Sequence, residues 1–426
     1  MGLFCVQMMA KAEHDEIVDN DTIRMMNVDE VVITSSTKET NDFRTLPSSV
    51  SVFTPQQING RQISALKDLS SFVPNLYIPD YGSRMTSAIY IRGIGARSSG
   101  QSIGMYVDDV PYLDKSTFDF ELSDIQRIEV LRGPQGTLYG RNAMGGIVKV
   151  YTISPFDFQG KKLSLSAGNY GQVKAKASHY GLLSEKIGFT AGVYYDHTNG
   201  YFTNEYTGEK ADKENVVGGR LRPEGHFSPH FSASYTFSAD YTDQGAFPYG
   251  LYDAETGTVA PVSMNDESAY SRTMFSNQLL LEYRNDLFIL SSTTGYQFFK
   301  DDMRMDQDFS PKSIFTLNQT QRQHAVSQEL ALKGNRAGNY QWSVGMYGFY
   351  TGLETEGPVT FKEDGIREIF QEKVFDPIYN NVVAQNPNTM MPRLVVLDKE
   401  LYIPGSFQTP SYGLALFHQS TYNNLF

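Results

Sequence analysis

The sequence has little cysteine, few histidines and no long apolar run. Cys5 is the one cysteine among 426 residues, so an internal disulfide and a multi-cysteine metal site are both excluded. We find no stretch of about 18 apolar residues, the length that a membrane-spanning helix needs. Basic residues are outnumbered, with 36 Lys and Arg against 48 Asp and Glu. The resulting net charge of -12 argues against nucleic acid as a partner.

The sequence also lacks the patterns that catalysis and metal binding require. No Ser/His/Asp, Cys/His or paired-carboxylate arrangement stands out, so we predict no enzyme activity, no cofactor and no metal site. His226 and His230 flank a turn at Pro229, but no third ligand accompanies them. The glycines around residue 140 lack the Gly-Lys-Ser/Thr ending of a phosphate loop, and Ser98 stands where a dinucleotide fingerprint needs glycine.

Glycine and aromatic residues are abundant, and their arrangement indicates a β-rich chain. The sequence has 36 Gly, 27 Tyr and 27 Phe, which favour turns and pleated strands respectively. From residue 161 apolar and polar residues alternate in segments of about ten, the length of a tilted strand that crosses a bilayer. Short connections alternate with long ones: 181–186, 228–230, 284–286 and 334–339 are short, and 197–214, 242–271, 300–324 and 352–409 are long. This rhythm is typical of an outer-membrane barrel, although any single strand also fits a soluble β-sandwich.

The first third of the chain has a mixed pattern that predicts a compact α+β unit. Residues 55–74 are predicted to form a helix that ends at Pro74, with Ile58, Ile63, Leu66, Leu69 and Val73 on its apolar face. We expect strands at 46–54, 87–92, 104–107, 127–131 and 146–152, and a turn at 108–111.

Two motifs in this unit carry a resemblance to a known family. They are Ile89-Tyr-Ile-Arg-Gly93 and the glycine-rich run from Ile125 to Ile147, which contains Leu131-Arg-Gly-Pro-Gln-Gly136. The run resembles the plug domain of TonB-dependent outer-membrane receptors. The resemblance implies an α+β plug domain followed by antiparallel transmembrane β-barrel strands. It divides the chain into a signal peptide remnant (1–12), a flexible segment with a TonB box (13–40), a plug (41–155) and the N-terminal part of the barrel (161–426).

The size of the plug conflicts with the number of strands. About ten strands at ~4.8 Å spacing and ~45° tilt close into a cylinder of radius roughly 11 Å. A plug of about 120 residues has a radius of gyration near ~14 Å and does not fit inside. Plugged outer-membrane transporters have about 22 strands. We therefore predict that the sequence is a fragment cut at the periplasmic end of its tenth strand; the alternative is that Phe426 is the terminal aromatic residue of a complete barrel.

The resemblance implies active uptake of a scarce nutrient across a bacterial outer membrane. Its expected partners are TonB with the inner-membrane complex that energises it, outer-membrane lipid, and a metal chelate or similar small ligand. A ferric siderophore is the first choice of ligand, because the domains that mark glycan-importing and signalling receptors do not precede the box. Haem and cobalamin are the alternatives within the family. A non-transporting remnant and a soluble β-rich binding module are the alternatives outside it.

The resemblance also assigns residues to roles. The TonB box, which pairs as an added strand with the edge of the partner's sheet, comprises Asp29, Glu30, Val31, Val32, Ile33 and Thr34. A latch between plug arginines and wall glutamates is predicted from Arg92, Arg132, Glu282 and Glu329. The plug glycines, which we expect in turns packed tightly against the barrel wall, are Gly93, Gly133, Gly136, Gly140, Gly145 and Gly146. Substrate contacts on outward plug loops are predicted at Tyr81, Arg84, Arg97 and Tyr112.

Overall fold

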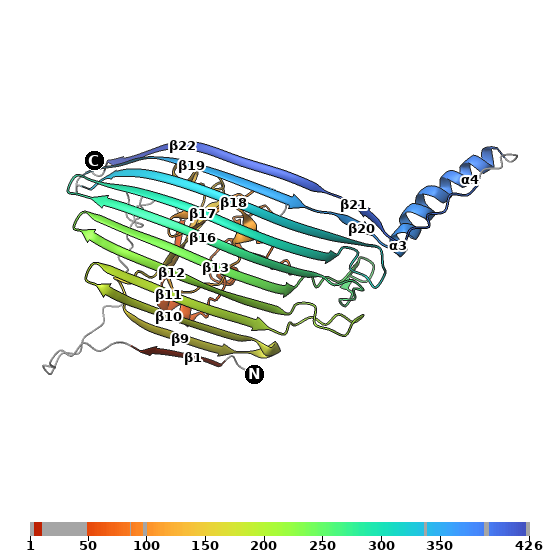
Figure 1. Cartoon of the computed structure of the whole chain (residues 1–426), viewed down its shortest axis with the longest axis horizontal. Helices are drawn as coiled ribbons and strands as arrows, with labels where there is room; N and C mark the ends of the chain where they lie inside the picture. Colours follow the sequence, from red (N-terminus) through yellow and green to blue (C-terminus); the bar gives the residue numbers. More distant parts are fainter. Residues whose placement is uncertain are drawn as a thin grey trace.

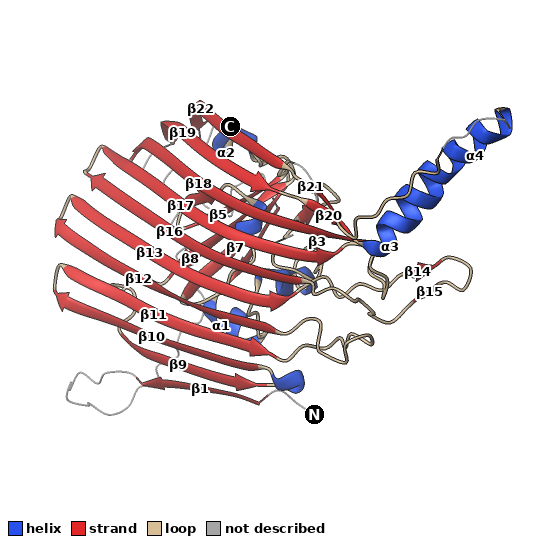
Figure 2. Ribbon diagram, turned by 45° about the vertical axis from the view of Figure 1, so that its right-hand side comes forward, coloured by secondary structure: helices blue, strands red, loops and turns tan. Residues whose placement is uncertain are grey.

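The chain folds into a small α+β domain and a large antiparallel sheet. A computed structural model describes residues 4–10, 49–85, 87–96, 100–335, 339–386 and 392–422. The small domain extends from β2 through β8, and the first long strand of the large sheet follows it at Gly160. In Figures 1 and 2 the small domain lies against one face of the large sheet. We call the small domain the plug and the large sheet the wall.

The wall is built in chain order, each long strand pairing antiparallel with the next. Its ten long strands are β9 (Gly160–Ala167), β10 (Val173–Ser184), β11 (Ile187–Thr198), β12 (Glu214–Ser228), β13 (Phe231–Gly245), β16 (Ala269–Arg284), β17 (Phe288–Asp306), β18 (Phe315–Gly334), β19 (Tyr340–Glu356) and β22 (Ser406–Tyr422). The short strand β20 (Val359–Phe361) pairs with β18 and with β21 (Leu401–Ile403). These strands confirm the predicted antiparallel barrel segments.

The N-terminal strand β1 (Phe4–Ala10) pairs with β9 along its whole length. The predicted signal peptide remnant, residues 1–12, falls partly on this strand, and its removal stays a prediction. Over the described residues the strand order runs from β1 to β22 without closing into a ring.

The two faces of the wall differ in polarity because successive side chains of a strand point to opposite sides. Val193, Val217 and Leu221 are 63%, 51% and 47% exposed and point away from the plug. Thr190 and Arg220, on the same two strands, are buried on the plug side. This alternation is the pattern that a barrel needs when lipid lies outside and a filled lumen lies inside.

The two ends of the wall also differ. Short turns follow β10, β12, β16 and β18, and long connections follow β11, β13 and β19, as predicted. The long connection predicted at 300–324 is wrong in extent, because β17 and β18 extend into it and leave only residues 307–314 between them. Strands β16 to β19 are 16 to 20 residues long, whereas a tilted strand needs about 9–11 residues to cross the hydrocarbon. These strands therefore continue beyond a bilayer.

The connections at the long-loop end carry the remaining small elements. The connection between β9 and β10 contains η4 (Asn169–Gly171). The long connections carry the hairpin β14 (Tyr252–Asp253) and β15 (Thr258–Val259), and an arm made of α3 (Glu363–Gly365), the π-helix η5 (Ile366–Phe375) and α4 (Asp376–Gln385). The arm projects away from the wall at its long-loop end (Figure 1). None of the described helices is long and apolar enough to span a membrane, a finding that concerns helices alone.

The plug is organised around a five-stranded sheet with the order β2-β7-β8-β5-β6. These strands are β2 (Ser49–Phe53), β5 (Ile103–Val107), β6 (Val110–Tyr112), β7 (Ile125–Arg132) and β8 (Gly146–Thr152). The other elements are α1 (Pro55–Gly60), η2 (Leu66–Ser71), β3 (Leu76–Tyr77), β4 (Tyr90–Ile91), η3 (Lys115–Thr117) and α2 (Gly136–Tyr139). Its core includes Met105, Ile128 and Val150, and Met274 and Phe299 of the wall join the same cluster.

The single helix predicted for residues 55–74 is wrong, although its apolar face is right. The chain forms α1 and then η2, with Gln62 between them at φ 53°, a left-handed conformation that interrupts a helix. The five apolar residues nevertheless all lie in the plug core: Ile58, Ile63, Leu66, Leu69 and Val73. The strand predicted at 87–92 is shorter, reduced to β4. Of the turn predicted at 108–111, Asp108 and Asp109 are confirmed by their positive φ angles, whereas Val110 and Pro111 belong to β6.

Candidate functional site: the interface between plug and wall

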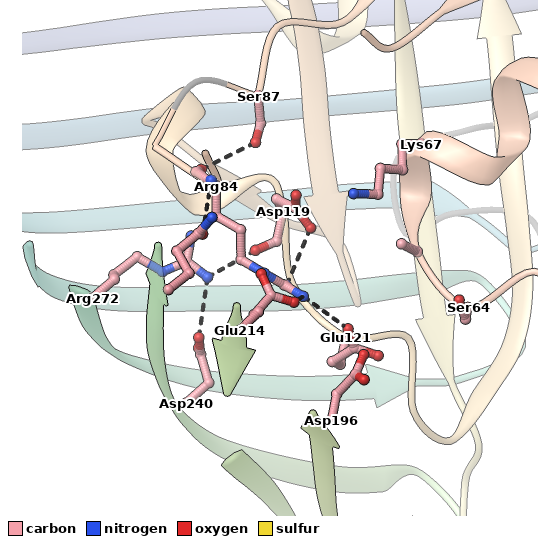
Figure 3. A network of polar contacts seen from close by, with 12 residues as sticks. Ser64, Lys67, Arg84, Ser87, Asp119, Glu121, Asp196, Glu214, Asp240 and Arg272 are labelled. Carbon is pink, nitrogen blue, oxygen red and sulfur yellow. Dashed lines mark hydrogen bonds and ion pairs between the residues drawn. The ribbon is translucent and has the colours of Figure 1, made fainter. Parts of the chain in front are cut away.

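Arg84, in the plug loop before β4, lies at the centre of a buried ion cluster (Figure 3). Its Nε and Nη2 atoms donate to the two carboxylate oxygens of Glu214 on β12, each at 2.9 Å. Nη2 also donates to Glu121 at 3.1 Å and Nη1 to Asp119 at 3.3 Å. The Arg84 side chain is 8% exposed. Burial alone would lower its pKa, but Asp119, Glu214 and Glu121 raise the pKa well above the ordinary value, so the guanidinium stays charged.

Glu121 connects this cluster to β10. Its carboxylate is 1% exposed and lies 3.5 Å from the Lys176 ammonium. Burial opposes its ionisation, yet Arg84 and the lysines Lys176 and Lys174 outweigh burial and lower the pKa of Glu121 to about 2. Lys174 in turn pairs with Asp196 of β11 at 2.6 Å. The plug and three adjacent wall strands thus share one charge network.

Cationic side chains of the wall also hold the plug backbone between residues 116 and 123. Arg272 of β16, whose side chain is fully buried, donates to the Ser116 carbonyl and, at 2.7 Å, to the Asp119 carbonyl. Arg220 of β12 donates to the Ser123 carbonyl at 2.8 Å, and Lys176 to the Leu122 carbonyl at 2.9 Å. Beyond η3 this segment is neither strand nor helix, so buried carbonyls that lack a secondary-structure partner receive one from the wall.

Further contacts join the plug to the wall away from this cluster. Arg222 of β12 donates to the Thr152 hydroxyl at 2.8 Å, and Tyr180 of β10 donates to Asp124. At the opposite side of the wall, Arg141 of the plug donates to the Ser411 hydroxyl at 2.8 Å and stacks on the Phe349 ring, 5.1 Å from its centroid. The plug is therefore anchored from β10 to β22.

The long connection after β13 folds over the plug loop that carries Arg84. The Phe247 amide donates to the Gly82 carbonyl at 2.8 Å, and the Tyr249 hydroxyl donates to the Tyr81 carbonyl at 2.5 Å. Phe247 is buried in a cluster with Tyr270 and Met303 of the wall, against which Met85 packs. This loop is consequently covered on its outer side and tied to the wall on its inner side.

These contacts correct two of the predicted substrate residues. Arg84 is buried and engaged by three carboxylates, so it anchors the plug and is not free to contact a ligand in this arrangement. Tyr112 is 3% exposed and stacks on Phe120 within the plug core. Tyr81 is partly buried, with its hydroxyl 3.3 Å from that of Tyr90. Arg97 lies outside the described residues, as does the whole TonB box from Asp29 to Thr34.

Two of the four residues predicted to form the latch, Arg132 and Glu282, have other partners. Arg132 donates to the Pro74 carbonyl at 3.0 Å, and Glu282 pairs with Arg284 of its own strand at 2.9 Å. Arg92 is exposed, and its guanidinium lies 3.5 Å from the point that a Cβ on Gly133 would occupy. Glu329 is buried on β18. Most of the anchoring cations lie on the wall and bind plug oxygens. The pair of plug Arg84 with wall Glu214 has the predicted polarity but involves other residues.

Some of the plug glycines adopt backbone conformations that other residues rarely adopt, and some lie too close to neighbouring atoms for a side chain. Gly93, Gly133, Gly140 and Gly146 have positive φ angles, which other residues rarely adopt. Gly145 and Gly146 also pack closely: a Cβ would lie 2.5 Å from Ile103 and 2.3 Å from the Leu131 carbonyl respectively. Gly136 has open space around it and ordinary helical geometry. The close approaches are made within the plug, whereas the prediction placed them against the wall.

The sequence contained a signal for the wall cations that the predictions did not use. Lys174 and Lys176 on β10, and Arg220 and Arg222 on β12, recur at every second position. Such spacing places each pair on one face of its strand, and long cations facing a lumen need acceptors there. In the described part of the chain no group of three or more His, Cys, Asp or Glu residues is arranged to hold a metal ion.

Comparison with known protein families gives a match to the plug. The TonB-dependent Receptor Plug Domain family model matches residues 42–147. The chain carries the plug and the barrel fold of a TonB-dependent receptor. The Pesticin receptor of Yersinia pestis is 33% identical over 127 residues, which are 29% of this chain and 19% of that protein. The Vitamin B12 transporter BtuB of Vibrio vulnificus is 29% identical over 174 residues, 38% of this chain and 26% of that protein.

Solved structures resemble nearly the whole fold. The ferric yersiniabactin uptake receptor FyuA from Yersinia pestis superposes with a TM-score of 0.64 at 17% identity, covering 87% of this chain and 62% of that one. The siderophore receptor PiuA from Acinetobacter baumannii gives 0.60 at 17% identity, covering 88% and 55%. The chain spans less than two thirds of the length of these relatives. The match of its plug domain and its fold indicate an outer-membrane protein.

Proposed function

We propose that this receptor takes up a ferric siderophore across the outer membrane, with energy delivered by TonB to residues 29–34. The observation that carries the proposal is the plug itself, held against the wall by a buried charge network centred on Arg84 and Glu214. Breaking a buried ion pair by removing one partner costs about 3–5 kcal/mol. A plug held in this way does not leave the lumen unaided, so an external source of work is needed to open a path.

Similarity to named receptors supports the choice of ligand. Two solved structures of the same fold are named as a ferric yersiniabactin uptake receptor and a siderophore receptor. Cobalamin is the second candidate, because the B12 transporter BtuB of Vibrio vulnificus matches a larger share of this chain than the pesticin receptor does. Haem remains an alternative by the same mechanism. The burial of Arg84 removes one of the two arginines that favoured an anionic chelate and leaves Arg97 as the other.

Uptake by cells tests the proposal directly. The gene is deleted at its native locus and restored, and accumulation of ⁵⁵Fe-loaded siderophores and of labelled cobalamin is measured in iron-starved cells with and without TonB. We expect siderophore uptake that requires both the gene and TonB. Cobalamin uptake alone would support the second candidate, and no gene-dependent uptake of either compound in cells that hold the protein in their outer membrane would contradict transport.

Two substitutions in the predicted TonB box test the coupling. Val32→Pro removes a backbone N–H from an extended segment and prevents strand pairing at that position, whereas Val32→Ala keeps the backbone donor. We expect Val32→Pro to abolish uptake while surface binding of the chelate persists, and Val32→Ala to retain most uptake. Equal uptake by the two variants would show that residues 29–34 do not pair as a strand.

A further inference from the structure

A hollow of about 600 Å³ lies on the face of the wall that points away from the plug, across β9 to β13. Its side chains come from the exposed set of the strand alternation, and they include Leu163, Val193 and Leu221. The hollow therefore faces the hydrocarbon of the membrane rather than the lumen, and it is separate from the plug interface.

Three small residues in one cross-strand row, Ala177, Gly219 and Ala239, form the floor of this hollow, and the larger Val193 lies between the first two. Ala177 lies opposite Val193, Val193 opposite Gly219, and Gly219 opposite Ala239, so the row crosses four neighbouring strands in register. The adjoining row carries the taller Leu221 and Phe237, which also line the hollow. The small residues beside taller ones leave a shallow groove that runs across the strands and is interrupted at Val193.

One end of the groove is cationic. Lys161 lies directly opposite His179 on β10, and both side chains are exposed on the outer face. Two other cations line the hollow but point inward: Lys162 stacks on Phe158, with its ammonium 5.0 Å from the ring centroid, and Arg220 binds a plug carbonyl. No carboxylate is among the residues that line it. The outward charge is thus positive and confined to the β9 end.

The cationic end lies toward the short-turn end of the wall. Short turns face the periplasm in outer-membrane barrels, and Lys161 follows Gly160, the first residue of β9, at the short-turn end. Phe237, at the other end of the groove, lies well inside β13. The groove therefore rises from the periplasmic surface into the hydrocarbon, as a lipid with its headgroup at the surface does.

We propose that this hollow binds one anionic phospholipid of the inner leaflet of the outer membrane. The phosphate lies at Lys161 and His179, and an acyl chain crosses Ala177, Gly219 and Ala239. Positive charge selects the headgroup, since juxtamembrane lysines attract anionic lipid, and the apolar groove buries the chain. The expected occupant is a phosphatidylglycerol-like lipid.

Native mass spectrometry of the intact receptor in mild detergent, titrated with phosphatidylglycerol or phosphatidylcholine, tests the proposal. We expect one phosphatidylglycerol to remain bound to the wild type at least tenfold more strongly than phosphatidylcholine. Ala177→Leu and Ala239→Leu fill the groove and should weaken binding about tenfold. Lys161→Gln should weaken phosphatidylglycerol about fivefold and leave phosphatidylcholine unchanged, because one lysine near the surface contributes about 1 kcal/mol.

Ala233→Leu is the matched control, since Ala233 lies on the same face of β13 but does not line the hollow. Heat-modifiable gel mobility identifies variants that fold. Equal lipid binding by the folded Ala239→Leu and Ala233→Leu proteins would overturn the proposal, as would equal affinity of the wild type for the two lipids. A change in the monomer–dimer ratio at constant lipid binding would also overturn it, because the hollow would then contact a second copy of the chain.

Discussion

Replacement of Arg84 by methionine is expected to release the plug loop from the wall. The substitution keeps much of the side-chain volume but removes the cation that Glu214, Glu121 and Asp119 share. Glu214 and Glu121 are 19% and 1% exposed, so little water replaces the lost donors. Removing one partner of a buried pair costs about 3–5 kcal/mol. Lys176 still lies 3.5 Å from Glu121, and we therefore expect about 3 kcal/mol for Arg84→Met.

Hydrogen exchange of the receptor in bilayers measures this effect, because protection of a plug peptide spanning residues 80–90 reports the free energy of local opening. Glu214→Gln and the double variant complete a cycle, in which we expect a coupling energy above ~1 kcal/mol between the two positions. Arg304→Met is the control, since its pair with Glu267 is 61% and 63% exposed and should contribute less than ~1 kcal/mol. Equal protection in Arg84→Met and Arg304→Met, or strictly additive effects in the cycle, would refute the assignment of Arg84 as an anchor.

Three other predictions follow from the same contacts. Gly146→Ala should lower the free energy of unfolding of the plug by more than ~2 kcal/mol in urea, since its Cβ would lie 2.3 Å from the Leu131 carbonyl at φ 150°. Gly136→Ala is the control, because Gly136 has open space around it, and it should be neutral or slightly stabilising. Equal losses of stability in the two variants would contradict the packing argument. The pKa of Glu121 is lowered from 4.5 to about 2, so its contribution to plug retention is full above pH 4.5 and is lost as the pH falls toward 2. Glu121→Gln should flatten the pH dependence of hydrogen-exchange protection of the plug in that window. An unchanged profile would show that Glu121 is not part of the network. Arg272→Met removes the donor of the Ser116 and Asp119 carbonyls and should loosen the plug, which we measure as greater sensitivity of cells to the large antibiotic vancomycin. Arg132→Ala loses one contact within the plug and should have a smaller effect. The opposite ranking would favour the latch predicted at Arg132.

The role of Arg84 illustrates why sequence reasoning misplaced the latch. Arg84 and Glu214, which form a two-point ion pair between plug and wall, are separated by 130 positions, and no local pattern relates them. An arginine in a polar loop is usually solvated, so the loop before β4 suggested an outward contact. Only the position of the plug against β12 makes Arg84 an inward-facing group.

The helix predicted at 55–74 shows the reverse situation. The spacing of Ile58, Ile63 and Leu66 correctly identified buried residues, because burial of apolar side chains depends on composition and period more than on the exact backbone. The left-handed conformation at Gln62 is a local choice that the pattern does not contain. Apolar periodicity therefore located the core but not the boundary between α1 and η2.

What the sequence determined by itself is the class of each segment. Alternation with period two, aromatic content and the rhythm of short and long connections specify a lipid-facing antiparallel sheet, and the motifs from Ile89 and Ile125 specify the plug. Both are local properties of consecutive residues. Only the tertiary structure decided which wall cation meets which plug oxygen, because those pairs depend on strand register and on how the plug sits against the wall. Register is set by whole strands, so Arg272 reaches the Ser116 carbonyl through contacts that no neighbour in sequence encodes.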